Sequence, residues 1–482
     1  MSLKQLTVMN LKISGALALF SRFSGIITSV VLARLLLPSD FGTITIAYIF
    51  LGAMNLFTEL GFGSAVIHRK EKIEEALGTS FTINLIISVL LFIVIILIAP
   101  FIASFYDEPT ITNVLRVLSI GIIISSFQFV PSVYFRKNLQ FRKMAIPTVL
   151  SGLTNSVISI TLAYFDFGVW SLVYGSLAST CVNVGTLLFL CPCKPKITFN
   201  KDIATELFVF GKYLFVANII VFINLHIDSA VGGKLLGLTA LGYYYLAYRW
   251  GTFSERIIGI TEKVMFPTYA KMQDDIPKLR KGYLKLLKYV SIMTFPMSLG
   301  LFAIATEFVM VVLGEKWIPS ITPMRILCIF GLFSTIASTT GSVFTAVGKP
   351  KLVRDLSFLM TIVIIVLIYP MITGFGIIGL SLTVTIGAVL SAIAASHYLL
   401  KVLDMDFISY VDAIKPSFIA TSFALIATGF AKFWPLVIYR MPDYISLTIL
   451  FTVFATVYLF TLYLVDRKTI EELIMSLKKN AL

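Results

Sequence analysis

Two stretches of this sequence, 200 positions apart, follow the same pattern. Residues 33–51 read ARLLLPSDFGTITIAYIFL, and residues 232–250 read GGKLLGLTALGYYYLAYRW. A shift of 200 positions aligns a basic residue, two leucines, a hydroxyl residue, a glycine and a tyrosine, in the pairs Arg34/Lys234, Leu35/Leu235, Leu36/Leu236, Ser39/Thr239, Gly42/Gly242 and Tyr48/Tyr248.

Two further pairs of segments recur in the same order. Ser132 and Val133 precede the basic turn RKNLQFRK, as Ser342 and Val343 precede GKPKLVR, an offset of 210. Residues 166–172, DFGVWSL, match residues 374–380, GFGIIGL, an offset of 208. Three matches at nearly constant spacing predict that six helices have been duplicated as a second set of six.

The composition places the chain in a membrane. Of its 482 residues, 58% are hydrophobic and only 13% are charged, whereas soluble domains carry about 25% charged residues. The net charge of +14 fits the excess of Lys and Arg that membrane proteins keep in cytoplasmic loops. Since no basic cluster lies on a polar domain, nucleic-acid binding is not expected.

A membrane-spanning helix needs about 20 mostly apolar residues. On this criterion the fold is all-α and integral to the membrane, with about fourteen spans near residues 11–36, 42–66, 79–104, 112–134, 145–165, 168–191, 207–231, 239–262, 288–313, 321–346, 355–373, 376–400, 414–434 and 444–465. Basic residues are concentrated in alternate connections, which predicts that both termini are cytoplasmic. The longest connection contains DDIPKLRKGYLKLLKY, which predicts a basic amphipathic helix on anionic lipid.

The repeat and the spans together predict three parts. Residues 1–200 form a first six-helix lobe, residues 201–405 a second, and residues 406–482 an additional helix pair with a cytoplasmic tail. Because six is an even number, the two lobes share one topology and are related by an axis along the membrane normal. Transporters built this way place their substrate site between the repeats, near the bilayer midplane.

Charged residues at membrane depth mark candidate sites, because each costs about 2.5–3.5 kcal/mol on insertion scales. Four deep basic residues, Arg22, Lys212, Arg249 and Arg256, are predicted to line a basic cleft suited to an anionic substrate. Guanidinium groups suit phosphate in particular. Glu255 lies beside Arg256 in sequence. The alternative for Glu255 is that it forms an ion pair inside the protein.

The deep acidic residues suggest ion coupling. Asp228 and Glu59 could each bind a proton or Na⁺, or neutralise a basic residue. His226 precedes Asp228 by two positions, and side chains at that spacing do not face each other on a helix. A shared metal site is therefore not expected.

No catalytic motif is found. Gly348 and Lys349 are followed by Pro350, and Val343 occupies the position where a P-loop needs its first glycine. The chain is therefore predicted not to be an enzyme and to hold no cofactor.

The sequence resembles a known family in several signature segments. HIDSAVGGKLLGLTALGYYYLAYR, RFSGIITSVVLARLLLPSDFGTITIA and FVFGKYLFVANI are similar to segments of polysaccharide flippases in the multidrug/oligosaccharidyl-lipid/polysaccharide superfamily. The likeness extends over the whole chain and is to Wzx-type exporters, in the colanic and teichuronic acid branch. Asp228, Gly233, Gly242 and Tyr248 occupy signature positions.

This resemblance implies transport of undecaprenyl-diphosphate-linked oligosaccharide repeat units from the inner to the outer leaflet of the bacterial inner membrane. It implies alternating access between two lobes, with a polysaccharide polymerase and export machinery as candidate partners. An alternative is a multidrug cation antiporter of the same superfamily, although such a protein would favour an acidic cleft. A membrane-embedded polymerase and a scaffold protein are less consistent with the short loops and the deep arginines.

Overall fold

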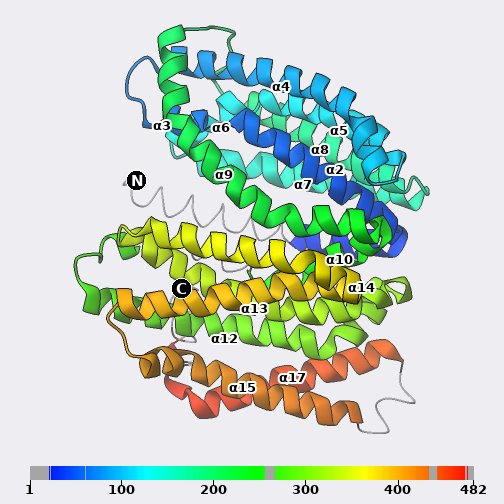
Figure 1. The fold of residues 1–482 in the computed structure, drawn as a ribbon, viewed down its shortest axis with the longest axis vertical. Coiled ribbons are helices and arrows are strands. Elements are labelled where there is room, and N and C mark those ends of the chain that lie inside the picture. The colour runs from blue at the N-terminus through cyan, green and yellow to red at the C-terminus, as the bar shows by residue number, and fades with distance from the viewer. Residues whose placement is uncertain are drawn as a thin grey trace. The chain divides into compact units, whose positions relative to one another are not determined.

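The computed structural model (Figure 1) describes residues 21, 23–59, 61–255, 265, 268–433, 442–469, 471, 472 and 475. Over these residues the chain is helical and contains no strand. The helices are α2 (Pro38–Glu59), α3 (Phe62–His68), α4 (Ile73–Phe105), α5 (Thr110–Ser126), α6 (Phe129–Lys137), α7 (Phe141–Tyr164), α8 (Val169–Leu190), α9 (Lys201–Leu236), α10 (Leu238–Gly251), α12 (Ile276–Phe308), the π-helix η1 (Val309–Leu313), the 3₁₀-helix η2 (Glu315–Ser320), α13 (Ile321–Ala346), α14 (Pro350–Val402), α15 (Phe407–Phe433) and α17 (Asp443–Val465).

The chain is a multi-pass membrane protein. Among the described residues, 10 helices are long and apolar enough to cross a bilayer, and α5 and α6, bent by 44°, bring the number to 11. The sequence predicted one straight span there, at 112–134, and missed this bend. The first and eighth predicted spans extend beyond the described residues, and both termini lie outside them, so the count of fourteen and the cytoplasmic termini stay predictions.

The chain divides into two compact units, Met1–Gly242 and Tyr243–Leu482. In the first unit α4 packs on α5, α5 packs on α8 and α2, and α7 packs on α8 (Figure 1). α9, which the sequence assigned to the second lobe, packs against α2, α3 and α4 in this unit. The lobe boundaries at residues 200 and 405 remain a prediction about the repeat.

In the second unit, α13 packs on α14 and α12, and α15 and α17 pack on each other and on α12. α17 is held to α12 partly by Tyr458, whose buried hydroxyl donates to the Ile292 carbonyl at 2.7 Å. The predicted basic amphipathic segment is not a separate surface helix. It forms the first turns of α12, where Leu279, Tyr283 and Leu287 are fully buried against the ends of α13, α14 and α15.

Backbone geometry at the matched segments supports the predicted duplication. Gly168 has φ 54° and ψ −133°, and Gly376, its counterpart 208 positions later, has φ 58° and ψ −134°. Gly168 precedes α8, whereas Gly376 breaks α14 into the two predicted spans 355–373 and 376–400. Both positions have positive φ, which glycine adopts without steric cost.

The helix ends near the basic turns 136–143 and 348–354 also share a hydrogen-bonding pattern, at an offset that differs by one residue from the predicted offset. The Gln140 N–H donates to the Phe135 carbonyl at 2.9 Å, and the Lys349 N–H donates to the Phe344 carbonyl at 2.8 Å. Phe135 and Phe344 are both fully buried. At these two helix ends the offset is therefore 209, one less than the offset of the serine pairing.

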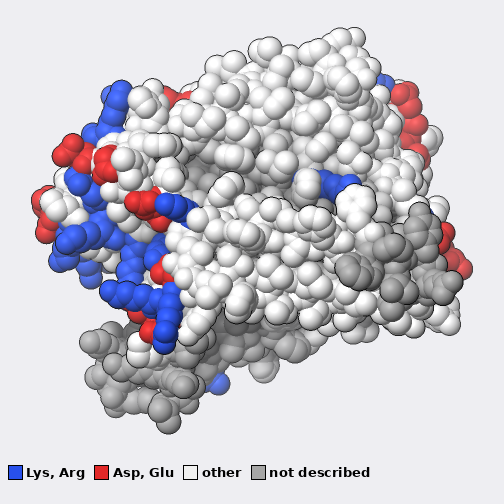
Figure 2. Space-filling model, turned by 90° about the horizontal axis from the view of Figure 1, so that it is seen from below, with Lys and Arg blue, Asp and Glu red and all other residues white. Residues whose placement is uncertain are grey.

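Charge is distributed as expected for a membrane protein. On the face shown in Figure 2, Lys, Arg, Asp and Glu gather towards the ends, and the broad surface between them is almost free of charge. Uncharged surface of this kind can face hydrocarbon, where a charged side chain is costly.

Candidate functional site

The four predicted cleft residues are only partly described by the structure. Arg22 and Arg256 lie outside the described residues, and Lys212 is placed in α9 by its backbone alone. Arg249 lies in α10, is half-buried, and donates from Nη1 to the Tyr245 hydroxyl at 3.2 Å. The basic cleft therefore stays a prediction, with Arg249 as its one fully described member.

The predicted coupling residues lie in the first unit. Glu59 is the last residue of α2, and its side chain lies outside the described part of the structure. Asp228 lies in α9 with 4% of its surface exposed. Two residues further on, the Ala230 carbonyl accepts from the Tyr106 hydroxyl at 3.1 Å, which fixes this turn of α9 against the end of α4. The His226 ring lies against Phe222, with the ring centroids 4.4 Å apart and the ring planes tilted by 49°.

Within the second unit, α10 and α13 cross with their backbones in contact. A Cβ on Gly251 would lie 2.9 Å from the Leu327 carbonyl carbon, and one on Gly331 would lie 2.7 Å from the Gly251 carbonyl oxygen. Real Cβ atoms do not approach so closely. Glycine at both positions is what allows the crossing, which places the residues after Gly251 directly beside α13.

Glu255 follows this crossing by one turn. Its Oε1 accepts from the Ser334 hydroxyl of α13 at 2.8 Å. The neighbouring Ser254 shares a buried 2.7 Å hydrogen bond with Ser298 of α12. The carboxylate is thus turned toward α13, whereas an ion pair with Arg256, which lies outside the described residues, stays a prediction.

A groove begins at Ser334 and continues between α13 and α14, with a cavity volume of ≈ 580 Å³. We call it the hydroxyl groove, because five of its twelve lining residues are Ser or Thr exposed to the space and a sixth, Ser391, is buried in its wall. The lining residues are Ser334, Ala337, Ser338, Gly341, Ser342, Thr345, Val353, Leu356, Ser357, Met360, Ser391 and Ala395.

The hydroxyl protons of this groove are directed into the helices. Ser338 donates to the Thr335 carbonyl at 3.2 Å, and Ser342 donates to the Thr339 carbonyl at 3.0 Å. A hydroxyl oxygen that donates in this way still has lone pairs to accept from a ligand. A groove lined with acceptors beside a carboxylate suits a ligand rich in hydroxyl donors.

The sequence analysis missed the groove. Ser334, Ser338 and Ser342 recur every four residues, which places them on one helical face, but serines and threonines inside an apolar run were counted only as part of a span. That spacing was the available signal. The second wall is supplied by α14. Its first half follows α13 after a short turn and could be expected beside it, but the return of Ser391 and Ala395 to the same groove is not indicated by the sequence.

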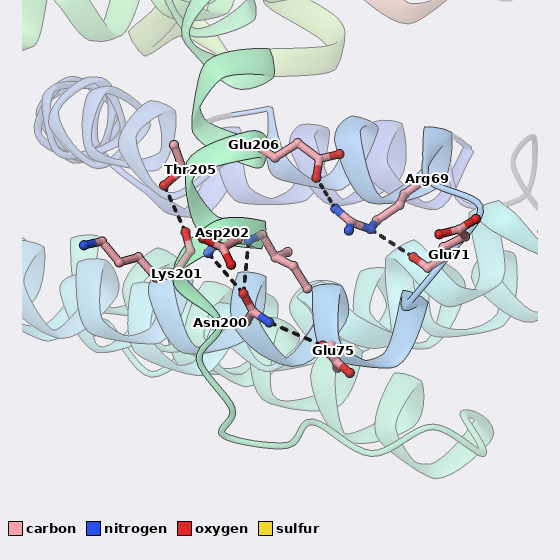
Figure 3. A network of polar contacts seen from close by, with 9 residues as sticks. Arg69, Glu71, Glu75, Asn200, Lys201, Asp202, Thr205 and Glu206 are labelled. Atoms are coloured by element: carbon pink, nitrogen blue, oxygen red, sulfur yellow. Dashed lines mark hydrogen bonds and ion pairs between the residues drawn. The ribbon is translucent and has the colours of Figure 1, made fainter.

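A polar network fixes the connection between α8 and α9 to the first unit (Figure 3). The Asn200 side chain accepts from the Asp202 N–H at 3.0 Å and so caps α9, while its amide reaches Glu75 of α4 at 3.5 Å. Arg69, after α3, contacts Glu206 of α9 at 2.6 Å. We call residues 191–200 the strap.

The strap lies directly on α4. Thr82 donates to the Thr198 carbonyl at 2.8 Å and accepts from the Thr198 N–H at 3.1 Å. A Cβ at Gly78 would overlap the Thr198 hydroxyl. Sequence reasoning treated the strap as an ordinary short loop, since nothing in its composition indicates which helix it contacts.

Two cysteines lie in the strap. Burial raises the pKa of the Cys191 thiol, and burial followed by the nearby Glu74 carboxylate raises that of Cys193. Cys193 and Glu74 line the same cavity of ≈ 420 Å³ beside Lys194 and Lys196. Raised thiol pKa values disfavour the thiolate, which is the metal-binding and nucleophilic form.

The fold and the grooves define a multi-pass helical membrane protein. Comparison with known proteins shows its family. Residues 31–322 match the family described as "Polysaccharide biosynthesis protein", and the chain belongs to this family.

Curated relatives cover most of the chain. It is 28% identical over 426 residues to "Lipopolysaccharide biosynthesis protein WzxC" of Escherichia coli K12, covering 86% of this chain and 82% of the relative. It is 26% identical over 383 residues to "Teichuronic acid biosynthesis protein TuaB" of Bacillus subtilis 168, covering 77% and 78%.

Solved structures share the fold. The lipid II flippase MurJ in an inward closed conformation superposes with a TM-score of 0.75 at 15% identity, over 95% of this chain and 99% of that one. An inward-facing multidrug resistance MATE transporter of the MOP superfamily gives a TM-score of 0.63 at 19% identity, over 80% and 94%. At these identities the likeness concerns the fold alone.

Proposed function

We propose that this protein transports undecaprenyl-diphosphate-linked oligosaccharide repeat units from the inner to the outer leaflet of the bacterial inner membrane, by alternating access and without covalent catalysis. The observation that carries the proposal is the hydroxyl groove beside Glu255, in a chain that belongs to a polysaccharide biosynthesis family. Its fold is shared with a lipid II flippase, which supports movement of a lipid-linked substrate.

The chemistry of such a substrate divides into parts that this chain can serve separately. Sugar hydroxyls would donate to the acceptor oxygens of Ser338 and Ser342 and to the Glu255 carboxylate. The diphosphate would be held by basic side chains, of which Arg249 is the described candidate and Arg22, Lys212 and Arg256 are the others. Guanidinium groups recognise phosphate through paired hydrogen bonds.

Energy for net export would come from an ion gradient. Asp228 is the stronger of the two proposed coupling residues, because it is buried and binding of H⁺ or Na⁺ would offset the cost of a buried carboxylate. Glu59 is the second. Polymerase and export machinery would receive the repeat unit in the outer leaflet.

A multidrug antiporter is the competing proposal, favoured by the MATE-like fold. Proteoliposomes containing the chain separate the two. Export predicts that a fluorescent undecaprenyl-diphosphate oligosaccharide becomes accessible to an impermeant quencher on the opposite side, while a cationic dye does not accumulate. Dye accumulation without movement of the lipid-linked sugar would support the antiporter and contradict the proposal.

A further inference from the structure

A second pocket lies at the end of the second unit where α14 both begins and ends. Its cavity volume is ≈ 540 Å³. We call it the lysine pocket, and its lining residues are Gly348, Lys349, Pro350, Lys351, Leu352, Tyr398, Lys401 and Val402. The three lysines come from two segments about fifty positions apart in sequence, which the folding of α14 at Gly376 brings to one place.

The lysine pocket has an uncompensated positive charge. Within the described residues, the ammonium groups of Lys349, Lys351 and Lys401, all exposed, make no ion pair. The neighbouring acids are engaged elsewhere, since Asp355 pairs with Arg354 at 2.8 Å and Asp404 pairs with Arg280 at 3.7 Å. Asp406 accepts hydrogen bonds from Ser409 at the start of α15.

The main chain at the pocket has a defined geometry. The turn before α14 is fixed by Gly348 at φ 71° and by the hydrogen bond from the Lys349 N–H to Phe344. Pro350 then opens the helix. The N-terminal end of α14 carries a partial positive charge, and its C-terminal end, at Lys401 and Val402, carries a partial negative one. The two helix ends offset each other, so the positive potential of the pocket comes from the lysines.

An apolar face leads away from the pocket along the second half of α14. Leu390, Ile393, Tyr398 and Lys401 lie on one side of the helix, and Leu390, Ile393 and Tyr398 are 43%, 59% and 42% exposed. From Lys401 back to Leu390 the helix rises about 16 Å, which is about the hydrocarbon depth of one leaflet.

The first half of α14 repeats this arrangement. Lys351 is followed on its own face by Phe358, Ile362 and Tyr369, which are 42%, 58% and 64% exposed. Two apolar faces thus meet at one cationic pocket. A soluble anion would use only the charge, whereas an amphiphile would use both the charge and the faces.

We infer that the lysine pocket binds the phosphate-bearing headgroup of an anionic membrane phospholipid, whose acyl chains lie along the exposed faces of α14. Tyr398 would lie at the level of the headgroups, where aromatic side chains are favoured. The site is separate from the hydroxyl groove and does not depend on the function proposed for it.

Native mass spectrometry of the full chain in detergent tests this inference, with phosphatidylglycerol or phosphatidylcholine added stepwise. The triple variant Lys349→Gln/Lys351→Gln/Lys401→Gln is expected to weaken phosphatidylglycerol binding by about tenfold or more, since lysines near a membrane surface attract anionic lipid. Phosphatidylcholine binding should not change. The matched control Lys281→Gln/Lys415→Gln/Lys468→Gln removes the same charge from other exposed positions of the second unit and should change binding less than about twofold.

Two further comparisons separate the sources of phosphate. Ile393→Ser should weaken phosphatidylglycerol binding, and inorganic phosphate in excess should not displace the lipid. Full displacement by inorganic phosphate together with an unaffected Ile393→Ser variant would assign the pocket to soluble phosphate and overturn the lipid assignment. Equal losses of phosphatidylglycerol binding in the two triple variants would show that only net charge matters. That result would overturn the lysine pocket as a binding site.

Discussion

Gly42 and Gly242, aligned by the 200-residue repeat, each lie against the main chain of the other's segment. A Cβ at Gly42 would overlap the Leu238 carbonyl oxygen, and a Cβ at Gly242 would overlap the Pro38 carbonyl oxygen. Pro38 and Leu238, the first residues of α2 and α10, are themselves 200 positions apart. The contact is therefore reciprocal, as expected where two copies of one segment cross about a local two-fold axis.

This crossing predicts a steric effect of substitution. Gly42→Ala and Gly242→Ala should each lower stability by about 1–3 kcal/mol, because the added methyl meets backbone, which yields less readily than a side chain. The melting temperature of the purified protein in detergent measures this. Gly185→Ala, in α8 with open space around the new Cβ, is the control and should not lower it. Unchanged melting of both crossing variants would show that the helices are not in contact there.

The strap makes a prediction about thiol chemistry. In a variant whose sole cysteine is Cys193, Glu74→Gln should increase the rate of maleimide labelling at neutral pH. The Glu74 carboxylate is one cause of the raised Cys193 pKa. Removing the Glu74 charge lowers the pKa of the Cys193 thiol, which increases the thiolate fraction at neutral pH. The pH–rate profile of labelling should therefore shift to lower pH. Glu71→Gln, at a nearby exposed position outside the cavity, should leave the profile in place.

Docking of the strap can be measured with the same thiol. Thr82→Val keeps the volume but removes the hydroxyl that both donates to and accepts from Thr198. The Thr198 N–H would lose its partner, at a cost of about 1–3 kcal/mol. Labelling of Cys193 should then accelerate at every pH. An effect confined to a pH shift would mean that the strap remains docked without this pair.

The predicted basic cleft is tested at Arg249. Arg249→Ala should reduce movement of the lipid-linked oligosaccharide strongly, and Arg249→Lys partially, because a lysine keeps the charge but lacks the paired donors of the guanidinium group. Arg354→Ala, an exposed arginine paired with Asp355, is the control. Wild-type rates in Arg249→Ala would remove Arg249 from the proposed site.

Ion coupling is tested at Asp228. Asp228→Asn keeps the shape of this buried side chain but cannot release a proton or attract Na⁺. Vesicles should then show movement of the lipid-linked sugar that no longer depends on an imposed H⁺ or Na⁺ gradient. A gradient dependence equal to that of the wild type would exclude Asp228 as the coupling residue.

The sequence predicted much of the fold because hydropathy and the repeat are local signals. Span positions such as 79–104 agree with α4, and the glycines that share a positive-φ backbone conformation, Gly168 and Gly376, were paired from sequence alone. The bend after Ser126 was missed although Pro131 is a signal for it, because a proline cannot donate to the carbonyl four residues earlier, here that of Phe127, and so kinks the helix.

The site was less accessible to sequence reasoning. Depth in the membrane drew attention to charged residues, and of these the structure describes Arg249 and Asp228 in full. The hydroxyl groove depends on α13 and α14 packing together, and the Glu255–Ser334 contact depends on the glycine crossing at Gly251 and Gly331. Local sequence patterns do not predict which distant segments come into contact in this way.

Whether the hydroxyl groove carries the substrate is measured by the movement of a labelled undecaprenyl-diphosphate oligosaccharide in proteoliposomes containing Gly341→Leu. Gly341 lines the hydroxyl groove and has open space at its Cβ position, so a leucine side chain there would extend from an uncrowded Cβ and narrow the groove. Gly429→Leu, a helical glycine of α15 with equally open surroundings outside the groove, is the matched control. Gly341→Leu is expected to slow movement by about tenfold or more, equivalent to about 1.4 kcal/mol of lost interaction, while Gly429→Leu transports normally. Normal transport by a stably folded Gly341→Leu protein would contradict the proposal that the substrate binds in the hydroxyl groove.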